Sequence, residues 1–407
     1  MAVNTPSPED TSERERDEPF DAEADFHPKR ITAQTFQRLL TCYNTTAQNV
    51  QRRKAMLKLQ PKGDSKKRKT GSGSDALITK TDFDTSEERI IKDQMEKYLD
   101  LDRWRYEGLP GLVWQRKQQG DVEGAAENEA RFTSEELCRI MEWKTKHGRP
   151  RPALMGMIRS NQEKLVFKCT STALKSLPTV KDKNKGKTTT ISEEVFPKQS
   201  MDDLSPLRGV GPATASLILS IATTNAKDEE TGEESERVQV PFFSDDTYLW
   251  LCVEVYPESS ASPETVRVIR NGGSGAGSGS GKGPGSKFIK PNGELNLKYN
   301  IAEYRELWEA CFELRERLNG AGGADATISM ADIEKVAYVL RNIALSGYYP
   351  GIDVQEILRM SAEQVEALSV RLGECEGGDG DDLPEQKNES ETRGEKGSRS
   401  SKKTRKT

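Results

Sequence analysis

A short apolar segment with two glycines in a turn, Met201 to Ala222, carries the residue pattern best suited to chemistry. The pattern predicts a short helix, a turn at Arg208-Gly209-Val210-Gly211, and a second helix that begins at Pro212, because proline suits the first helical position. Glycine allows backbone conformations and close approaches that a side chain would forbid. The free N–H groups of such a turn and of a helix N-terminus can bind a phosphate oxygen. We therefore expect a contact with a phosphate group that is independent of base sequence.

A second segment, Val240 to Leu249 (VPFFSDDTYL), places two adjacent aspartates before an apolar run. The hairpin sequence LRGVGPATASLIL resembles that of the helix-hairpin-helix superfamily of base-excision DNA glycosylases, and PFFSDDTYL is similar to the catalytic loop of its 3-methyladenine-type members. The resemblance implies that Asp246 is the catalytic aspartate, with Asp245 as its neighbour. It also implies that hairpin residues contact double-stranded DNA: Arg208, Gly209, Val210, Gly211, Ala213 and Thr214.

The reaction that this resemblance implies is cleavage of the N-glycosidic bond of a damaged nucleotide. The sugar becomes oxocarbenium-like in the transition state, and a nearby carboxylate stabilises that cation. The nucleotide must first leave the duplex stack and enter a pocket, where aromatic side chains stack on its base. The alternative is that these aromatic side chains only pack in the core. The residues that we expect in the base pocket are Trp104, Tyr106, Trp143, Tyr248 and Trp250.

Departures from the superfamily narrow the expected activity. Members that also cut the strand carry a Schiff-base lysine after the hairpin, and the matching position here is Ala213, so we expect a monofunctional glycosylase without lyase activity. The six cysteines contain no CxxC pair, so no iron–sulfur cluster is expected. The chain has two histidines, and we expect no metal site. We expect no cofactor other than a monovalent cation at the hairpin.

Two alternatives remain open at this point. Asp246 followed by Thr-Tyr-Leu-Trp is also a good helix N-cap, which contributes about 1 kcal/mol of stability without catalysis. Upstream, WRYEGLPG and MEWKTKHGRPRPALMGMIRSN resemble a little-characterised eukaryotic, notably fungal, group with this domain, and match no substrate pocket of a characterised glycosylase. The chain is therefore either an active glycosylase or a catalytically inactive, glycosylase-fold DNA-binding subunit of a chromatin complex.

Clusters of basic residues are the other feature of the sequence that indicates nucleic-acid binding. Lys144, Arg149 and Arg151 belong to a run that can follow DNA phosphates, although solvated charge explains many such runs. Two further clusters, 66–69 and 402–406, are typical of nuclear localisation signals. We therefore expect a nuclear protein whose partners are double-stranded DNA and chromatin-associated proteins. The apolar runs are too short to cross a membrane, and we expect no membrane partner.

Helices have to position these residues. Hydrophobic residues make up 33% and charged residues 31% of the chain, a composition too polar for every segment to fold. Capping boxes at Thr85/Glu88 and Thr133/Glu136 predict two helix starts, and apolar spacing predicts further helices up to residue 372. We expect an all-α, helix-hairpin-helix glycosylase-like domain at 84–372 with flexible insertions at 181–194, 223–237 and 271–286, between a mostly disordered tail at 1–83, which includes one helix at 31–59, and a disordered charged tail at 373–407.

Overall fold

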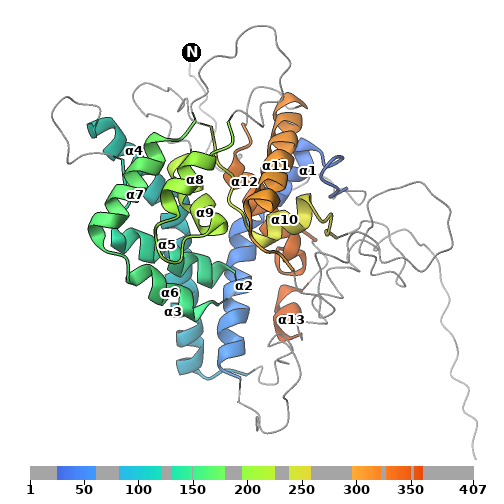
Figure 1. Cartoon of the computed structure of the whole chain (residues 1–407). Helices are drawn as coiled ribbons and strands as arrows, with labels where there is room; N and C mark the ends of the chain where they lie inside the picture. The colour runs from blue at the N-terminus through green and yellow to red at the C-terminus, as the bar shows by residue number, and fades with distance from the viewer. Residues whose placement is uncertain are drawn as a thin grey trace, which may run out of the picture. The chain divides into compact units, whose positions relative to one another are not determined.

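The structure is a computed structural model that describes residues 25–60, 82–120, 130–148, 150–178, 195–224, 238–257, 296–321, 327–349 and 353–360. The described residues form helices and no strand, which confirms the all-α prediction (Figure 1). A π-helical turn, Trp104–Gly108, joins α3 to α4, and a 3₁₀ turn, Ile343–Leu345, follows α12. The α-helices are α1 (Ala33–Thr41), α2 (Tyr43–Lys58), α3 (Thr85–Arg103), α4 (Leu109–Gly120), α5 (Ser134–His147), α6 (Pro152–Arg159), α7 (Glu163–Lys175), α8 (Lys198–Leu204), α9 (Pro212–Ala222), α10 (Asp245–Leu251), α11 (Ile301–Ala321), α12 (Met330–Arg341) and α13 (Val354–Arg359).

Local capping signals decide where two of these helices begin. α5 begins at the expected box, in which Thr133 Oγ1 accepts from the Glu136 N–H at 3.1 Å and Glu136 accepts from the Thr133 N–H at 2.9 Å. The predicted cap of α3 is wrong by one residue: its N-cap is Asp84 rather than Thr85, and its partner is Glu87. The aspartate is the better cap because its carboxylate accepts two backbone N–H groups of the first turn.

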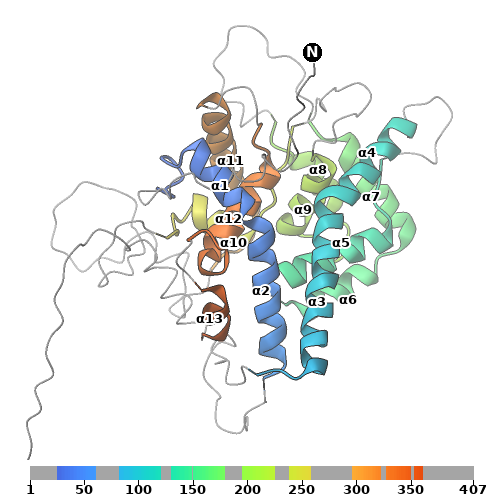
Figure 2. The ribbon, with the colours of Figure 1, turned by 180° about the vertical axis from the view of Figure 1, so that it is seen from behind.

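The segment expected as one helix over 31–59 forms two helices, because the chain bends at Cys42. The Cys42 N–H bonds to the Leu39 carbonyl oxygen at 3.0 Å, a tighter turn that ends α1 before α2 begins. α2 then lies beside α3 and also contacts α12 (Figure 2). The helical unit therefore begins well before residue 84.

The chain that precedes α1 also packs on the helices. Phe26 is buried, and its carbonyl oxygen accepts the Trp250 indole N–H at 2.8 Å. Arg317 of α11 donates to two carbonyl oxygens near the start of α1, at 2.7 and 2.8 Å. Within the tail predicted at 1–83 as mostly disordered apart from one helix, residues 25–30 are therefore packed on the helices, and the residues before 25 lie outside the described part of the chain.

α9 lies at the centre of the core and positions the hairpin that precedes it. Leu217, Ile218 and Leu219 are fully buried, as the apolar sequence of this helix predicted, and α9 contacts α4, α8 and α11. Beside it, Arg105 Nη2 of the π-helical turn lies 2.6 Å from Glu334 Oε2 of α12, and both side chains are buried. This ion pair ties the turn to α12 inside the core.

The hydrophilic insertions fall almost entirely outside the described residues. Segments 181–194 and 271–286 lie wholly outside them, as does the predicted tail at 373–407. Thr223, the first residue of the insertion predicted at 223–237, instead belongs to the core: it is buried, and its hydroxyl accepts the Val240 N–H at 2.9 Å. Among the described helices, none is both long and apolar enough to cross a membrane.

Candidate active site

A cavity of about 530 Å³ lies where the hairpin, α5, α10 and α12 meet. Both hairpin glycines, Gly209 and Gly211, line it together with Asp246, although the hairpin and the aspartate are separated by the predicted insertion. The structure thus brings the two predicted motifs to one site. The charged residues in the cavity wall are Lys54, Lys144, Arg151, Lys298, Arg341, Asp245 and Asp246.

Gly209 is the position in the hairpin that requires glycine. Its φ angle is +83°, in the left-handed region that side chains disfavour. A Cβ atom there would also lie 3.2 Å from Leu154 Cδ1 and 3.2 Å from Met157 Cβ. Asn161 holds the turn from outside, because its side chain accepts from the Arg208 N–H at 2.8 Å and donates to the Arg208 carbonyl oxygen at 3.0 Å. The hairpin is therefore rigid before any ligand binds.

Gly211 differs, because it faces open space. Its φ angle is −104°, and a Cβ atom there would meet no heavy atom within 4 Å. Among the described residues, none accepts a hydrogen bond from the backbone N–H of Gly211 or of Ala213, which opens α9 after Pro212. Two free N–H groups and the positive end of a helix of 11 residues thus face the cavity. This arrangement suits an anionic oxygen.

Asp246 is the second residue of α10, and it does not cap that helix. The N-cap is Ser244, whose hydroxyl accepts from the Thr247 N–H at 3.1 Å, so the capping alternative for Asp246 is wrong. No described residue donates a hydrogen bond to its carboxylate. Burial, with the charge of Asp245, raises the pKa of Asp246 to about 6, whereas Arg341 and Lys54 favour its ionised form. The carboxylate is therefore ionised at neutral pH and free to act on a ligand.

Two lysines in the cavity wall lose part of their basicity by burial. Lys144 Nζ donates to the Ala213 carbonyl oxygen at 2.9 Å and to Thr214 Oγ1 at 3.1 Å. Burial, together with the nearby charge of Arg151, lowers its pKa to about 7. Lys54 Nζ donates to the last carbonyl oxygens of α5 at 2.8 Å, and burial lowers its pKa to about 8. Lys144 thus places its amine beside the hairpin, whereas the charge of Lys54 acts on Asp246.

Asp245, the neighbour of the expected catalytic residue, has a different role. Its Oδ1 accepts from the Tyr299 hydroxyl at 2.8 Å, and Arg151 Nη2 donates to that hydroxyl at 3.3 Å. Burial beside Asp245 raises the pKa of Tyr299 to about 12, so this phenol stays protonated. Arg151, Tyr299 and Asp245 therefore form a hydrogen-bonded rim, and Asp246 is the carboxylate that remains available.

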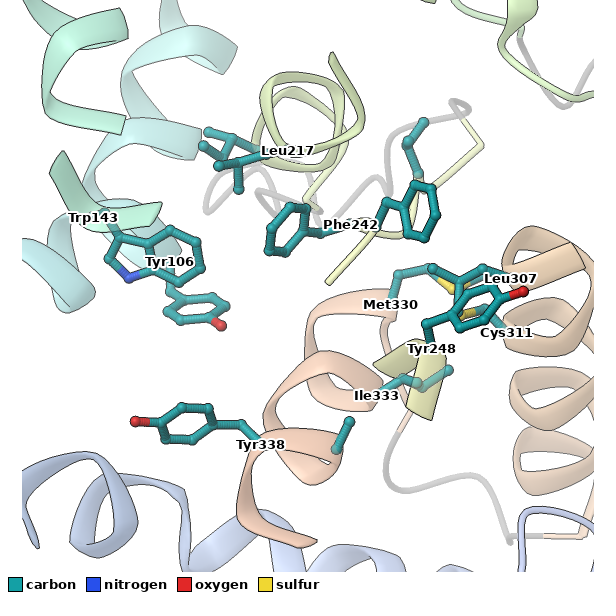
Figure 3. Close-up of a cluster of buried hydrophobic side chains, with 14 of the residues drawn as sticks. Tyr106, Trp143, Leu217, Phe242, Tyr248, Leu307, Cys311, Met330, Ile333 and Tyr338 are labelled. Atoms are coloured by element: carbon teal, nitrogen blue, oxygen red, sulfur yellow. The ribbon is translucent and has the colours of Figure 1, made fainter. Parts of the chain in front are cut away.

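Of the five aromatic residues expected in the base pocket, Trp143 alone lines the cavity. Tyr248 donates to Glu306 of α11 at 2.7 Å, and Figure 3 shows it beside Leu307, apart from Trp143. Trp250 is tied to Phe26, as described above, and Trp104 lies under the Arg139 guanidinium. Tyr106 is buried and donates to Glu334 at 3.0 Å. For these four, the alternative of packing and structural hydrogen bonds agrees with the structure.

The remaining predicted DNA contacts lie around the cavity or outside the described residues. Arg208 is exposed beside the hairpin and does not line the cavity, Val210 is buried, and Arg149 is not among the described residues. Conversely, His147, Tyr338 and the already named Lys54 and Arg341 line the cavity although nothing in the sequence selected them. The one signal that could have found His147 is its rarity, because the chain has two histidines.

Within the described residues, no group of three or more side chains could hold a metal ion. At the hairpin, the carbonyl oxygens of Leu207, Arg208 and Gly211 already accept hydrogen bonds from Val210, Asn161 and Thr214, respectively. Each of these oxygens keeps a second lone pair, so a monovalent cation at the hairpin stays a prediction.

Comparisons of this chain with protein-family models, with curated proteins and with solved structures give no match.

Proposed function

We propose that this protein binds double-stranded DNA through the hairpin and excises damaged bases as a monofunctional DNA N-glycosylase. One observation carries the proposal: an ionisable carboxylate without a hydrogen-bond donor among the described residues, Asp246, shares a cavity of about 530 Å³ with the free N–H groups of the hairpin. A carboxylate with this exposure to a ligand site and a raised pKa is typical of a catalytic group rather than of a structural one.

The residues support a sequence of steps. The N–H groups of Gly211 and Ala213, with the ammonium group of Lys144, bind a phosphate of the DNA backbone. A nucleotide turned out of the duplex places its base in the cavity, where Trp143 supplies an aromatic surface. As the C1′–N bond breaks, the electron pair leaves with the base, and Asp246 stabilises the sugar cation. Water then adds to C1′ and loses a proton to solvent, the departing base takes up a proton from solvent, and the product is an abasic site.

The monofunctional part of the proposal depends on which amine can reach the sugar. Ala213 occupies the position at which lyase members carry their lysine. Two amines of the cavity wall are engaged by the protein: Lys144 Nζ donates to the Ala213 carbonyl oxygen and Thr214 Oγ1, and Lys54 Nζ donates to carbonyl oxygens at the end of α5. We therefore expect base release without strand cleavage. Borohydride trapping on abasic duplex DNA tests this point directly, and a covalent adduct would contradict it.

The decisive experiment is base release from a panel of duplexes that each contain one damaged base. Asp246→Asn keeps the size of the side chain and removes its charge, so release should fall by about 100-fold or more while duplex affinity stays nearly unchanged. Asp245→Asn is the matched control, because its carbonyl oxygen can still accept from Tyr299, and it should retain most of the activity.

Two outcomes of this experiment would contradict or redirect the proposal. If the wild-type chain releases no base from any duplex of the panel, the glycosylase proposal is wrong. If the same preparation binds duplex DNA through the hairpin, the chain is instead a non-catalytic DNA-binding subunit, and Asp246→Asn is silent.

A further inference from the structure

His147 lies in the cavity wall as the middle ring of an aromatic stack. Its ring centroid is 4.5 Å from that of Trp143, with 19° between the planes, and 4.2 Å from that of Tyr338, with 28° between the planes. On one edge, its Nδ1 lies 2.6 Å from the Tyr98 hydroxyl oxygen. Its Nε2, on the other edge, makes no hydrogen bond to a described residue, although His147 lines the cavity. The ring is therefore held in place with one nitrogen left for a ligand.

Asp102, which is buried, is within hydrogen-bonding distance of three neighbouring side chains of this cluster. Its Oδ1 accepts the Trp143 indole N–H at 2.7 Å, and an indole N–H can only donate. The Tyr98 hydroxyl oxygen lies 3.2 Å from the same Oδ1, so Tyr98 can donate its single proton to this carboxylate. The Tyr43 hydroxyl also donates to Asp102, at 3.0 Å. When Tyr98 donates to Asp102, it can only accept from His147, and the Nδ1 of that ring then carries the proton.

The charge of the His147 ring follows from its surroundings. Burial lowers the pKa of His147 well below its ordinary value, and the positive charges of Lys54 and Arg105 act in the same direction. The ring is therefore neutral at physiological pH and carries one proton. Because that proton is on Nδ1, the Nε2 atom presents a lone pair.

We infer that His147 Nε2 is a hydrogen-bond acceptor in the cavity wall, and that it selects nucleobases that present an amino or ring N–H donor. The inference rests on the proposed function, because it assumes that the cavity receives a base. Tyr98 and Asp102 are positioning residues that hold the required tautomer. The Tyr338 hydroxyl is also buried and has no partner among the described residues. Figure 3 shows Tyr338 extending from α12.

Nitrogen NMR tests the tautomer without any DNA. The chain has two histidines, and they should have opposite tautomers: His27 Nδ1 accepts the Lys29 N–H at 3.0 Å, so its proton is on Nε2. A long-range ¹H–¹⁵N spectrum of the full chain at pH 8 should therefore show one ring of each kind. His27→Gln assigns the signals. A proton on Nε2 of His147 would overturn the inference.

Binding of free bases tests the selection. Adenine and purine, both methylated at N9 so that neither carries a ring N–H, share the same rings, but purine lacks the amino group. The wild-type chain should bind adenine about fivefold to tenfold more tightly than purine, the worth of one hydrogen bond. Tyr98→Phe removes the acceptor of the Nδ1 proton and should abolish the preference. Tyr304→Phe is the matched control, because Tyr304 is equally buried, donates to the Pro241 carbonyl oxygen and lies outside the cavity wall.

The outcomes separate this inference from the proposed function. Equal affinity for the two bases, no binding of either, or a preference that survives Tyr98→Phe would overturn the inference. Base release from damaged DNA without such a preference would leave the glycosylase proposal intact and remove only the role of His147. A preference for adenine in a chain that releases no base would overturn the glycosylase proposal and leave the acceptor in place.

Discussion

Alanine substitutions at the two hairpin glycines should separate the stability of the turn from its contact with DNA. At Gly209, the φ angle of +83° costs a non-glycine residue about 1–2 kcal/mol. The new methyl group would also press on Leu154, Met157 and Ile158 at 3.2, 3.2 and 3.3 Å, and such overpacking costs about 1–3 kcal/mol. Gly209→Ala should therefore lower the free energy of unfolding by about 2–5 kcal/mol.

Gly211→Ala should leave the stability of the fold nearly unchanged and weaken the binding of duplex DNA. The backbone there has an ordinary φ angle of −104°, and the methyl group would meet no heavy atom within 4 Å, so stability should change by about 0.5 kcal/mol or less. The methyl group would, however, stand in the cavity beside the N–H groups proposed to bind phosphate. Loss of a hydrogen bond to a charged group costs about 1.5–3 kcal/mol, so duplex affinity should fall by about 10- to 100-fold.

Two measurements on the same preparations check this pair. Urea denaturation gives the free energy of unfolding, and fluorescence anisotropy with a labelled duplex gives the affinity at one fixed ionic strength. Gly156→Ala in α6 is the control, because its methyl group would also meet no heavy atom within 4 Å and Gly156 does not line the cavity. If Gly211→Ala binds the duplex as tightly as wild type, the hairpin is not the phosphate contact. A fully stable Gly209→Ala would refute the packing argument.

Three further predictions concern buried charge. The folded-state pKa of Asp246, about 6, exceeds its ordinary value, so its ionised form destabilises the fold above pH 6. Asp246→Asn should therefore raise the free energy of unfolding, measured by urea denaturation, by about 1–3 kcal/mol at pH 8 and by almost nothing below pH 4. Base release should rise with pH through about 6 as Asp246 ionises and fall above about 7 as Lys144 loses its proton. The measurement is kcat/KM as a function of pH, and a profile without these two limbs would contradict the prediction. Glu334→Gln leaves the buried Arg105 uncompensated and should cost about 3–5 kcal/mol, whereas Glu142→Gln, in an exposed pair, should cost under about 1 kcal/mol; equal losses would contradict this reasoning.

Short-range signals were predictable from the sequence. The cap of α5 depends on Thr133 and Glu136, three residues apart, and the turn at Gly209 depends on a conformation that glycine alone adopts readily. The error at the start of α3 has the same origin, because Asp84/Glu87 and Thr85/Glu88 both have the spacing of a capping box. Spacing alone could not choose between them, since the choice depends on which side chain reaches more N–H groups.

The composition of the cavity wall was not predictable in the same way. Lys54 belongs to α2, which we assigned to a tail, and it reaches the cavity because α2 packs against α12. Trp143 and Trp250 both lie in apolar helical patterns, but Trp143 lines the cavity, whereas Trp250 donates to the Phe26 carbonyl oxygen in the core. Aromatic residues serve both purposes equally well, and only the tertiary packing decides which of them faces a ligand.

Burial is the common cause of the shifted pKa values of Asp246 and Lys144. Burial raises the pKa of Asp246 to about 6 and lowers that of Lys144 to about 7, so both are charged together only in a narrow interval around pH 6–7. A phosphate bound beside Lys144 favours its protonated form and therefore raises its pKa. DNA binding should thus extend the interval on its alkaline side, and the site reaches its full charge when the substrate is present. If the hairpin binds DNA as proposed, its occupation therefore sets the pH range in which Asp246 and Lys144 are charged together.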